Sequence, residues 1–270
     1  MIYLKTIFSA AAEIKYLKLN IREAFPYIDK FIICEFNRTH TGATRELIFN
    51  NYYSEFSASE QAKIIYLGVE AASFIKPAQD NRQQAHKNEK IMRGYFASQI
   101  KLANNDIIFS VDADEIIFGQ KYPQLIAQLK FWRPAIQLPL YQFYYRLNYL
   151  WANNKFIAPT VCRAWYYKFR YPGQWRYAGW IYPEITGCHF SWCLTIPEML
   201  AKIKGYAHQQ DYQSLAQTEI LTAAVESKTY PFDPQVDFQI KVLDLNKDKS
   251  YFPPTLYEIL DDFKSLIAKK

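Results

Sequence analysis

The chain has 270 residues, and the 50% that are hydrophobic suffice for a sizeable buried core, which excludes a disordered protein. Its formal net charge of +6 comes from Lys and Arg residues spread along the chain rather than gathered in a stripe, which argues against nucleic-acid binding. A mildly basic surface of this kind suits an acidic small molecule and, equally well, peripheral association with an anionic membrane face.

The amino-terminal half alternates predicted strands and helices. Residues 1–12 are interpreted as a first strand rather than a signal peptide, because Lys5 lies inside the apolar run. Apolar residues three or four apart predict a helix over residues 12–25. The further elements expected here are strands at 30–34 and 63–67, a helix after residue 88, a strand ending near 111, a helix around 125–129 and a strand over 135–145. This order predicts an α/β fold with a mostly parallel central sheet flanked by helices.

The chain changes character between about residues 146 and 192. Aromatic residues, Arg and Gly dominate this region, as in Trp165-Tyr166-Tyr167 and the segment QWRYAGW at 174–180. The pattern predicts twisted antiparallel strands and loops, a common place for a substrate surface added to an α/β core. Sugars and bases stack on aromatic faces, although an aromatic-rich core explains the same composition equally well. Helices are expected from near Pro197 and Asp211, and one more after Pro254.

The sequence contains no stretch of about 18 apolar residues, so it predicts no membrane span. The four cysteines, Cys34, Cys162, Cys188 and Cys193, lack CxxC pairs and zinc-ligand spacing. Reduced thiols in a cytoplasmic protein of a bacterium or virus are the simplest interpretation.

Residues 105–116 hold the strongest candidate for chemistry. An apolar run of strand length ends there in Asp112, Asp114 and Glu115. The unbroken Ile, Phe and Val residues are typical of a strand buried on both faces, and ligands of open α/β sheets bind beyond the carboxyl ends of such strands. Two Asp residues one position apart can both turn toward a divalent cation, whereas a capped turn is the alternative. A second polar loop, Glu35 to Gly42, follows the strand predicted at 30–34.

Three segments in this order resemble glycosyltransferase family 17, the β-1,4-mannosyl-glycoprotein 4-β-N-acetylglucosaminyltransferase type. The first, residues 13–42, contains EFNRTHTG, similar to the family's E-x-N-x-T-H-T-G loop. The second runs from the KNEKIMRG helix at 87–94 to DADEI at 112–116, and the third is GCHFSWC at 187–193. Lys87, Cys188 and Asn20 depart from the family's usual residues, as do Gln83 and Gln84.

The resemblance implies a GT-A-like nucleotide-sugar-binding fold in a single domain over residues 1–270. Residues 1–145 would bind the nucleotide sugar, and residues 146–270 would form the acceptor part and the carboxyl-terminal helices. The implied reaction is an inverting, metal-dependent transfer of a sugar, GlcNAc by the resemblance, from a UDP-sugar to a hydroxyl of a glycan acceptor. The residues expected to contact the nucleotide sugar are Glu35, Asn37, Arg38, Thr39, Asn88, Arg93 and Asp112.

A Mn²⁺ or Mg²⁺ ion suits oxygen-rich ligation and would stabilise the diphosphate leaving group. The expected ligands are Asp114, Asp112 and His189, with His208 as a further candidate. The alternative for His189 is a core histidine bonded to a backbone carbonyl. Arg93 is expected to reach the diphosphate as a forked donor, or else to pair with the sheet edge.

An inverting transfer needs a base for the acceptor hydroxyl. Glu184 is the candidate, with Glu115 next, although Glu115 also suits a supporting role in the Asp-x-Asp turn. The predicted stacking wall for the acceptor is Trp175, Trp180 and Trp192.

Two other classes of protein remain as alternatives. One is a non-catalytic, aromatic-rich carbohydrate-binding protein on a transferase-like fold. The other is an Asp-x-Asp phosphatase, which Ile116 disfavours because such enzymes need Thr or Val there. A calcium loop is excluded because DADEIIFG lacks the spaced acids and the Gly at its sixth position.

Overall fold

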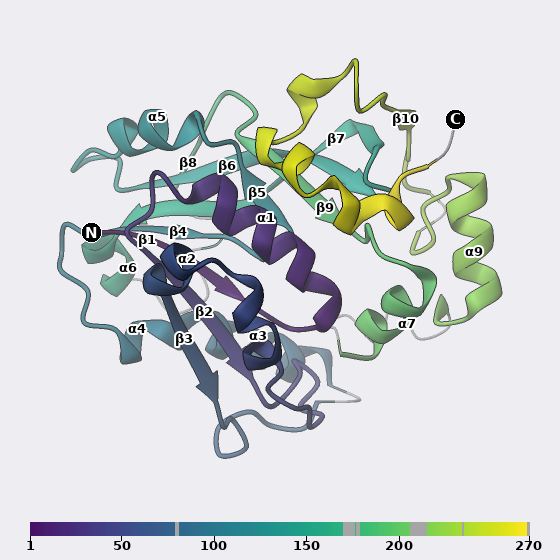
Figure 1. The fold of residues 1–270 in the computed structure, drawn as a ribbon. Helices are drawn as coiled ribbons and strands as arrows, with labels where there is room; N and C mark the ends of the chain where they lie inside the picture. The colour runs from purple at the N-terminus through teal and green to yellow at the C-terminus, as the bar shows by residue number, and fades with distance from the viewer. Residues whose placement is uncertain (79–80, 170–175, 177–178, 206–214, 234, 269–270) are drawn as a thin grey trace.

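The computed structural model describes residues 1–78, 81–169, 176, 179–205, 215–233 and 235–268. Its centre is a mixed ten-stranded sheet in which the main strand order is β3-β2-β1-β4-β7-β6-β9-β5 (Figure 1). Two short strands lie off this path, β10 beside β7 and β8 beside β6. The protein is therefore an α/β structure, as the sequence predicts.

One half of the sheet is parallel. Its strands are β1 (Ile2–Ile7), β2 (Lys30–Phe36), β3 (Ile64–Val69) and β4 (Ile107–Ser110), and every neighbouring pair runs parallel. The connecting elements are η1 (Ala11–Glu13), α1 (Ile14–Ala24), η2 (Phe49–Glu55), α2 (Ala58–Lys63), α3 (Arg82–Gly94) and α4 (Phe96–Gln99). The carboxyl ends of four strands consequently meet along one edge.

The other half is largely antiparallel, so the prediction of a mostly parallel sheet holds for the first four strands. Its strands are β5 (Glu115–Ile117), β6 (Ala135–Tyr144), β7 (Tyr149–Arg163), β8 (Trp180–Ile181), β9 (Gly187–Ser191) and β10 (Ile240–Val242). A tight connection joins β6 to β7, and β7 returns antiparallel beside both β6 and β4. Tyr145 begins this connection with φ 63°, a left-handed conformation.

The helices of the second half differ from prediction at α6. They are α5 (Lys121–Gln128), α6 (Ala164–Phe169), α7 (Ile196–Gly205) and α9 (Thr218–Ser227). Trp165 to Tyr167, predicted as strand or loop, belong to α6. The predicted helix start at Asp211 lies outside the described residues.

The tail after Pro254 contains 3₁₀ helices rather than the expected α-helix. These are η5 (Pro254–Glu258) and η6 (Leu260–Leu266), preceded by η4 (Lys249–Tyr251). Phe263 and Leu266 are buried, and their spacing of three residues matches the three-residue turn of a 3₁₀ helix.

Alternate residues of the parallel strands bury against opposite helical layers. Phe31, Ile33 and Phe109 pack with Leu17 and Ile21 of α1. On the other face, Ile32, Cys34 and Ile108 pack with Met92 and Phe96. Burial on both faces explains the unbroken apolar runs of β2 and β4. None of the helices in the described part of the chain is long and apolar enough to cross a membrane.

Candidate active site

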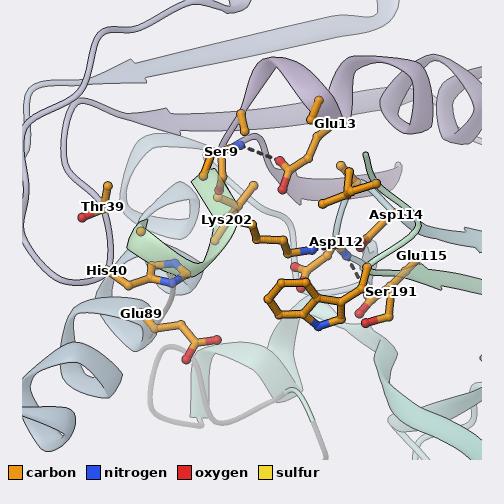
Figure 2. A pocket seen from close by; sticks show the side chains of 18 of the residues that line it. Ser9, Glu13, Thr39, His40, Glu89, Asp112, Asp114, Glu115, Ser191 and Lys202 are labelled. Carbon is orange, nitrogen blue, oxygen red and sulfur yellow. Dashed lines mark hydrogen bonds and ion pairs between the residues drawn. The ribbon is translucent and has the colours of Figure 1, made fainter. Parts of the chain in front are cut away.

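A cavity of about 1240 Å³ lies at the carboxyl ends of β1, β2 and β4. The segments that follow these strands contribute Ser9, His40 and Asp112 to its wall. Further lining residues come from α3, β9 and α7, among them Glu89, Ser191 and Lys202 (Figure 2). The parallel arrangement thus brings together polar residues that are far apart in sequence.

The acids after β4 form a tight turn. The Glu115 N–H donates to the Asp112 carbonyl at 3.0 Å, and the Asp112 N–H donates to Glu115 Oε2 at 2.7 Å. Asn20 of α1 donates from Nδ2 to the Glu115 carbonyl at 3.0 Å. Glu115 therefore supports the turn, which was the alternative role that the sequence suggested for it.

Asp112 is held by two arginines. Arg93 of α3 donates to both carboxylate oxygens of Asp112, at 2.6 and 3.0 Å, and Arg176 Nη1 lies 3.1 Å from Oδ1. Burial acts to raise the pKa of Asp112, but Arg176 and Arg93 hold it well below its usual range. Arg93 also donates from Nε to Glu89 at 2.9 Å. Its guanidinium thus makes the ion pair at the sheet edge that was the alternative to a diphosphate contact.

Glu115 is fully buried, and its second carboxylate oxygen pairs with Arg176. Burial raises the pKa of Glu115 to about 7, against the opposing charge of Arg176. With one oxygen on the Asp112 amide and the other on Arg176, the carboxylate is committed to the turn and to an ion pair.

Asp114 faces His189 and Lys202. The β5–β9 register pairs Glu115 with His189, which brings the imidazole beside the acids. His189 Nε2 lies 3.8 Å from Asp114 Oδ1, and Lys202 Nζ lies 3.5 Å from Asp114 Oδ2. Burial lowers the pKa of His189 to about 4, so the ring is neutral at pH 7. Within the described residues, its buried Nδ1 has no hydrogen-bond partner.

Glu13 is a carboxylate in the same cavity that sequence reasoning missed. It lies at the end of η1, accepts a hydrogen bond from the Ser9 N–H at 2.7 Å, and reaches in from the side opposite Glu89 (Figure 2). Burial raises the pKa of Glu13 to about 7, Lys202 opposes that shift and Asp114 adds to it. Glu13 therefore shares the cavity with the Asp114 and Lys202 charges.

Some of the residues predicted to contact the nucleotide lie in the cavity wall, and others lie behind the loop after β2. Arg38 and Thr39 line the cavity, and so does His40, which the prediction omitted. Glu35 instead is buried behind the loop, where its carboxylate accepts from the Ile48 and Phe49 amides and from Tyr66. Asn37 accepts from the Ala71 N–H at 2.8 Å and donates to Glu70. Glu35 and Asn37 therefore shape the loop and do not line the cavity.

Asn88 likewise lies outside the cavity lining. Its Nδ2 donates to the carbonyls of His40 at 2.8 Å and Lys76 at 2.7 Å, which fastens the loop after β2 to α3. Gly42 makes this approach possible, because its φ is 85° and an added Cβ would lie 2.6 Å from the Lys76 carbonyl. Asn88 thus acts on the cavity indirectly, through the loop after β2 that contains His40.

Replacement of Asn88 by Ala is expected to lower the free energy of unfolding by about 1–3 kcal/mol, because buried carbonyls lose their donor. Urea denaturation measures the change. Gln83→Ala, at an exposed position of the same helix, is the matched control and should shift the midpoint little. Equal midpoints for the two variants would contradict this role of Asn88.

Other predicted site residues lie elsewhere. Glu184 is outside the cavity lining, with a side chain that is 63% exposed and paired with Lys121, so its position does not suit a catalytic base. Trp180 is also outside the lining, on the short strand β8, whereas Trp192 does line the cavity. Trp175 and His208 lie outside the described residues.

The cavity lining includes four residues to which the sequence analysis assigned no role: Glu13, His40, Arg176 and Lys202. Glu13 and His40 belong to the first segment that resembles the family, which is the one sequence signal available for them. Lys202 lies on an ordinary amphipathic helix and Arg176 in an aromatic segment, so proximity to the acids is visible in three dimensions alone.

The solved structures to which this chain is similar include two synthases. A 4-diphosphocytidyl-2C-methyl-D-erythritol synthase from Anaerococcus prevotii DSM 20548 is 11% identical, with a TM-score of 0.33, over 60% of this chain and 70% of that one. A second structure titled as a 4-diphosphocytidyl-2C-methyl-D-erythritol synthase is 12% identical, with a TM-score of 0.32, over 60% and 75%. No curated protein matches the sequence.

The sequence itself matches a known family. The match is to glycosyltransferase family 17 and spans residues 2–224, which includes β1 to β9, all three acids after β4 and the whole of α7. This range contains every segment that carries the sequence resemblance. The chain therefore belongs to glycosyltransferase family 17.

Proposed function

We propose that this glycosyltransferase transfers GlcNAc from UDP-GlcNAc to a glycan hydroxyl with inversion, on a GT-A-like fold. The observation that carries the proposal is the cavity at the strand ends, in which Asp114, His189 and Lys202 meet the loop after β2. Its volume of about 1240 Å³ exceeds the roughly 300–1,000 Å³ typical of a site for one small ligand. A donor and part of an acceptor therefore have room together.

The donor would lie between the loop after β2 and α7. Arg38, Thr39 and His40 offer polar groups for the nucleoside at one end. Lys202 offers an ammonium for the diphosphate at the other. Burial acts to lower the pKa of Lys202, but the charges of Asp114 and Glu13 raise it above its usual value, so the ammonium remains protonated at pH 7. Asp112, fixed by Arg93, would face the ribose.

Asp114 and His189 would hold a Mn²⁺ or Mg²⁺ ion. A buried neutral imidazole beside a carboxylate is a suitable donor pair, with 3.8 Å between His189 Nε2 and Asp114 Oδ1. Groups of three His, Cys, Asp or Glu placed to bind a metal are absent from the described residues. Protein sites for Mg²⁺ often have one or two carboxylates completed by substrate phosphates, and this pair fits that pattern. The ion would supply charge stabilisation to the departing diphosphate.

Glu13 would serve as the base that an inverting transfer requires. Its pKa of about 7 matches proton transfer at neutral pH, and its carboxylate keeps an oxygen that the Ser9 amide does not use. Glu115 has both oxygens engaged, and Glu184 lies outside the cavity lining. Glu13 therefore replaces both acids that the sequence suggested for this role.

Trp192 would form the stacking surface for the acceptor sugar. Its backbone φ is 56°, a left-handed conformation that a bulky residue seldom adopts and that costs energy. The indole lines the cavity, and Lys202 Nζ lies 5.5 Å from its ring centre. A strained aromatic residue at the cavity wall supports a role in binding.

The donor assignment predicts a ligand-dependent rise in melting temperature. UDP-GlcNAc with Mn²⁺ should raise the midpoint by several degrees, because a ligand at about 100 times its Kd stabilises by about 2.7 kcal/mol. GDP-mannose and CMP-sialic acid with Mn²⁺ are the matched controls and should raise it less. A thermal-shift screen in which no uridine compound acts in a Mn²⁺-dependent manner would overturn the donor assignment.

A further inference from the structure

A two-residue hairpin between α5 and β6 presents two aromatic side chains to solvent. The Lys130 and Arg133 backbones exchange hydrogen bonds of 3.1 Å each, which places Phe131 and Trp132 at the tip. These side chains are 79% and 80% exposed, which makes them the most exposed large hydrophobic residues among the described ones. Adjacent aromatic side chains that are exposed to solvent favour aggregation, unless they form an interaction site.

The aromatic surface continues beyond the tip. Trp165 of α6 stacks on Phe131 with 5.5 Å between ring centres, and the Arg133 guanidinium lies 4.2 Å from the Trp180 ring centre. Trp180 and Ile181 of β8 are themselves 39% and 48% exposed. We define Phe131, Trp132, Trp165, Trp180 and Ile181 as the aromatic patch.

The patch has a basic surround. Three segments meet here, because Arg163 donates to the Leu129 carbonyl and Lys168 to the Leu102 carbonyl. Residues 101–106, 128–135 and 163–168 contain five basic residues, Lys101, Lys130, Arg133, Arg163 and Lys168, and one acid, Asp106. Asp106 is buried and pairs with the chain's amino terminus at 2.7 Å. Exposed aromatics ringed by basic side chains are the composition of surfaces that bind anionic bilayers.

The patch lies at the opposite end of the strands from the cavity. Arg163 pairs with Ile107 at the start of β4, whereas Asp112 and Asp114 follow the end of that strand. In Figure 1 the amino terminus and α6 lie on the left and α7 on the right. A bilayer on the patch therefore leaves the cavity free to open toward solvent.

We propose that the aromatic patch docks this protein on an anionic phospholipid surface. Phe131 and Trp132 insert at the headgroup level, where aromatic side chains are favoured, and Lys130 and Arg133 contact lipid phosphates. The hydrogen-bonded hairpin and the stacking of Phe131 on Trp165 position the aromatic side chains before contact, so less side-chain freedom is lost on binding. The acceptor is then a glycan that extends away from the membrane plane toward the cavity.

Vesicle flotation with the full chain tests the proposal. Wild type should float with vesicles of phosphatidylglycerol and phosphatidylcholine, less with phosphatidylcholine alone, and less in high salt. The double variant Phe131→Ser/Trp132→Ser and the variant Lys130→Glu should each reduce the bound fraction by about tenfold. Val242→Ser and Lys247→Ser, exposed residues outside the patch, are the matched controls and should float as wild type does.

Unchanged melting temperatures would show that each variant is folded. The proposal is overturned if wild type does not float with anionic vesicles, or if the patch variants float as the controls do. It is also overturned if the double variant dissolves a dimer detected by analytical ultracentrifugation, since the patch would then be a contact between copies. None of these results depends on donor binding, so the proposed reaction stands or falls separately.

Discussion

Glu13→Gln is expected to lower turnover by about 10²- to 10⁴-fold, the usual contribution of a general base. The amide keeps the shape of the carboxylate and can still accept from the Ser9 N–H, but it cannot take the acceptor's proton. Donor binding should survive, so the UDP-GlcNAc thermal shift with Mn²⁺ is expected to remain. Steady-state kinetics should show the loss in kcat rather than in the KM for the donor.

The pH dependence gives the prediction a second readout. The base must be ionised, so kcat/KM of the wild type is expected to rise as the pH increases through about 7 and then to level off. The residual activity of Glu13→Gln should lack this rise. A profile in the variant that is parallel to that of the wild type would remove Glu13 from the role.

Glu13→Gln should raise the melting temperature at alkaline pH, although it lowers the activity. The pKa of Glu13 is raised from 4.5 to about 7 by burial, so the folded state binds this proton more tightly than the unfolded state does. The stability from the neutral carboxyl is present below about pH 4.5 and is lost as the pH rises through about 7. Glu13→Gln carries no charge, and it should therefore melt above wild type at pH 8.

Glu184→Gln is the matched control for Glu13→Gln. The side chain is an exposed acid paired with Lys121, outside the cavity lining. We expect near-wild-type turnover and melting temperature, because an exposed ion pair contributes little. Loss of turnover in Glu184→Gln, with Glu13→Gln still active, would reverse the two assignments.

The parallel half of the fold was predictable because its signals are local. The apolar runs of β2 and β4 are buried on both faces, and such runs are recognisable without a partner strand. The reversal at β7 was not predictable, since the connection begins at Tyr145 in a left-handed conformation rather than at a Gly or Asn. The aromatic run of α6 favours a strand by propensity, but the Ala164 and Trp165 amides bond to the carbonyls of Asp106 and Asn104 instead.

The candidate site, like the fold, was predictable only in part. Asp112 and Asp114 were predictable because they follow a buried strand, and strand ends are where α/β sheets bind ligands. Glu13 and Lys202 are separated from them by about a hundred residues, and their approach depends on how α1 and α7 pack. Glu35 and Asn88 show the converse, since residues of a family-like motif lie near the cavity and serve the shape of its loop.

Asp114→Asn is expected to lower the affinity for Mn²⁺ in donor binding by at least about a hundredfold. Even residues that contact a metal only through its ligands contribute about 10- to 100-fold to metal affinity. The amide retains one oxygen but lacks the charge that a divalent ion requires. The Mn²⁺-dependent part of the UDP-GlcNAc thermal shift should disappear, and titration of free Mn²⁺ by electron paramagnetic resonance should show weaker binding. Retention of both signals would remove Asp114 from the metal.

Lys202→Met is the control variant, because its expected effect on the affinity for Mn²⁺ is opposite to that of Asp114→Asn. The ammonium lies 3.5 Å from Asp114 Oδ2, so in the absence of a divalent ion it already neutralises the carboxylate. Loss of that charge leaves Asp114 more attractive to a cation, and the methionine approximates the length of the aliphatic stem. Mn²⁺ should therefore bind Lys202→Met more tightly than wild type while the diphosphate binds less tightly. Mn²⁺ affinity that falls in both Asp114→Asn and Lys202→Met would contradict a competition between lysine and metal at one carboxylate.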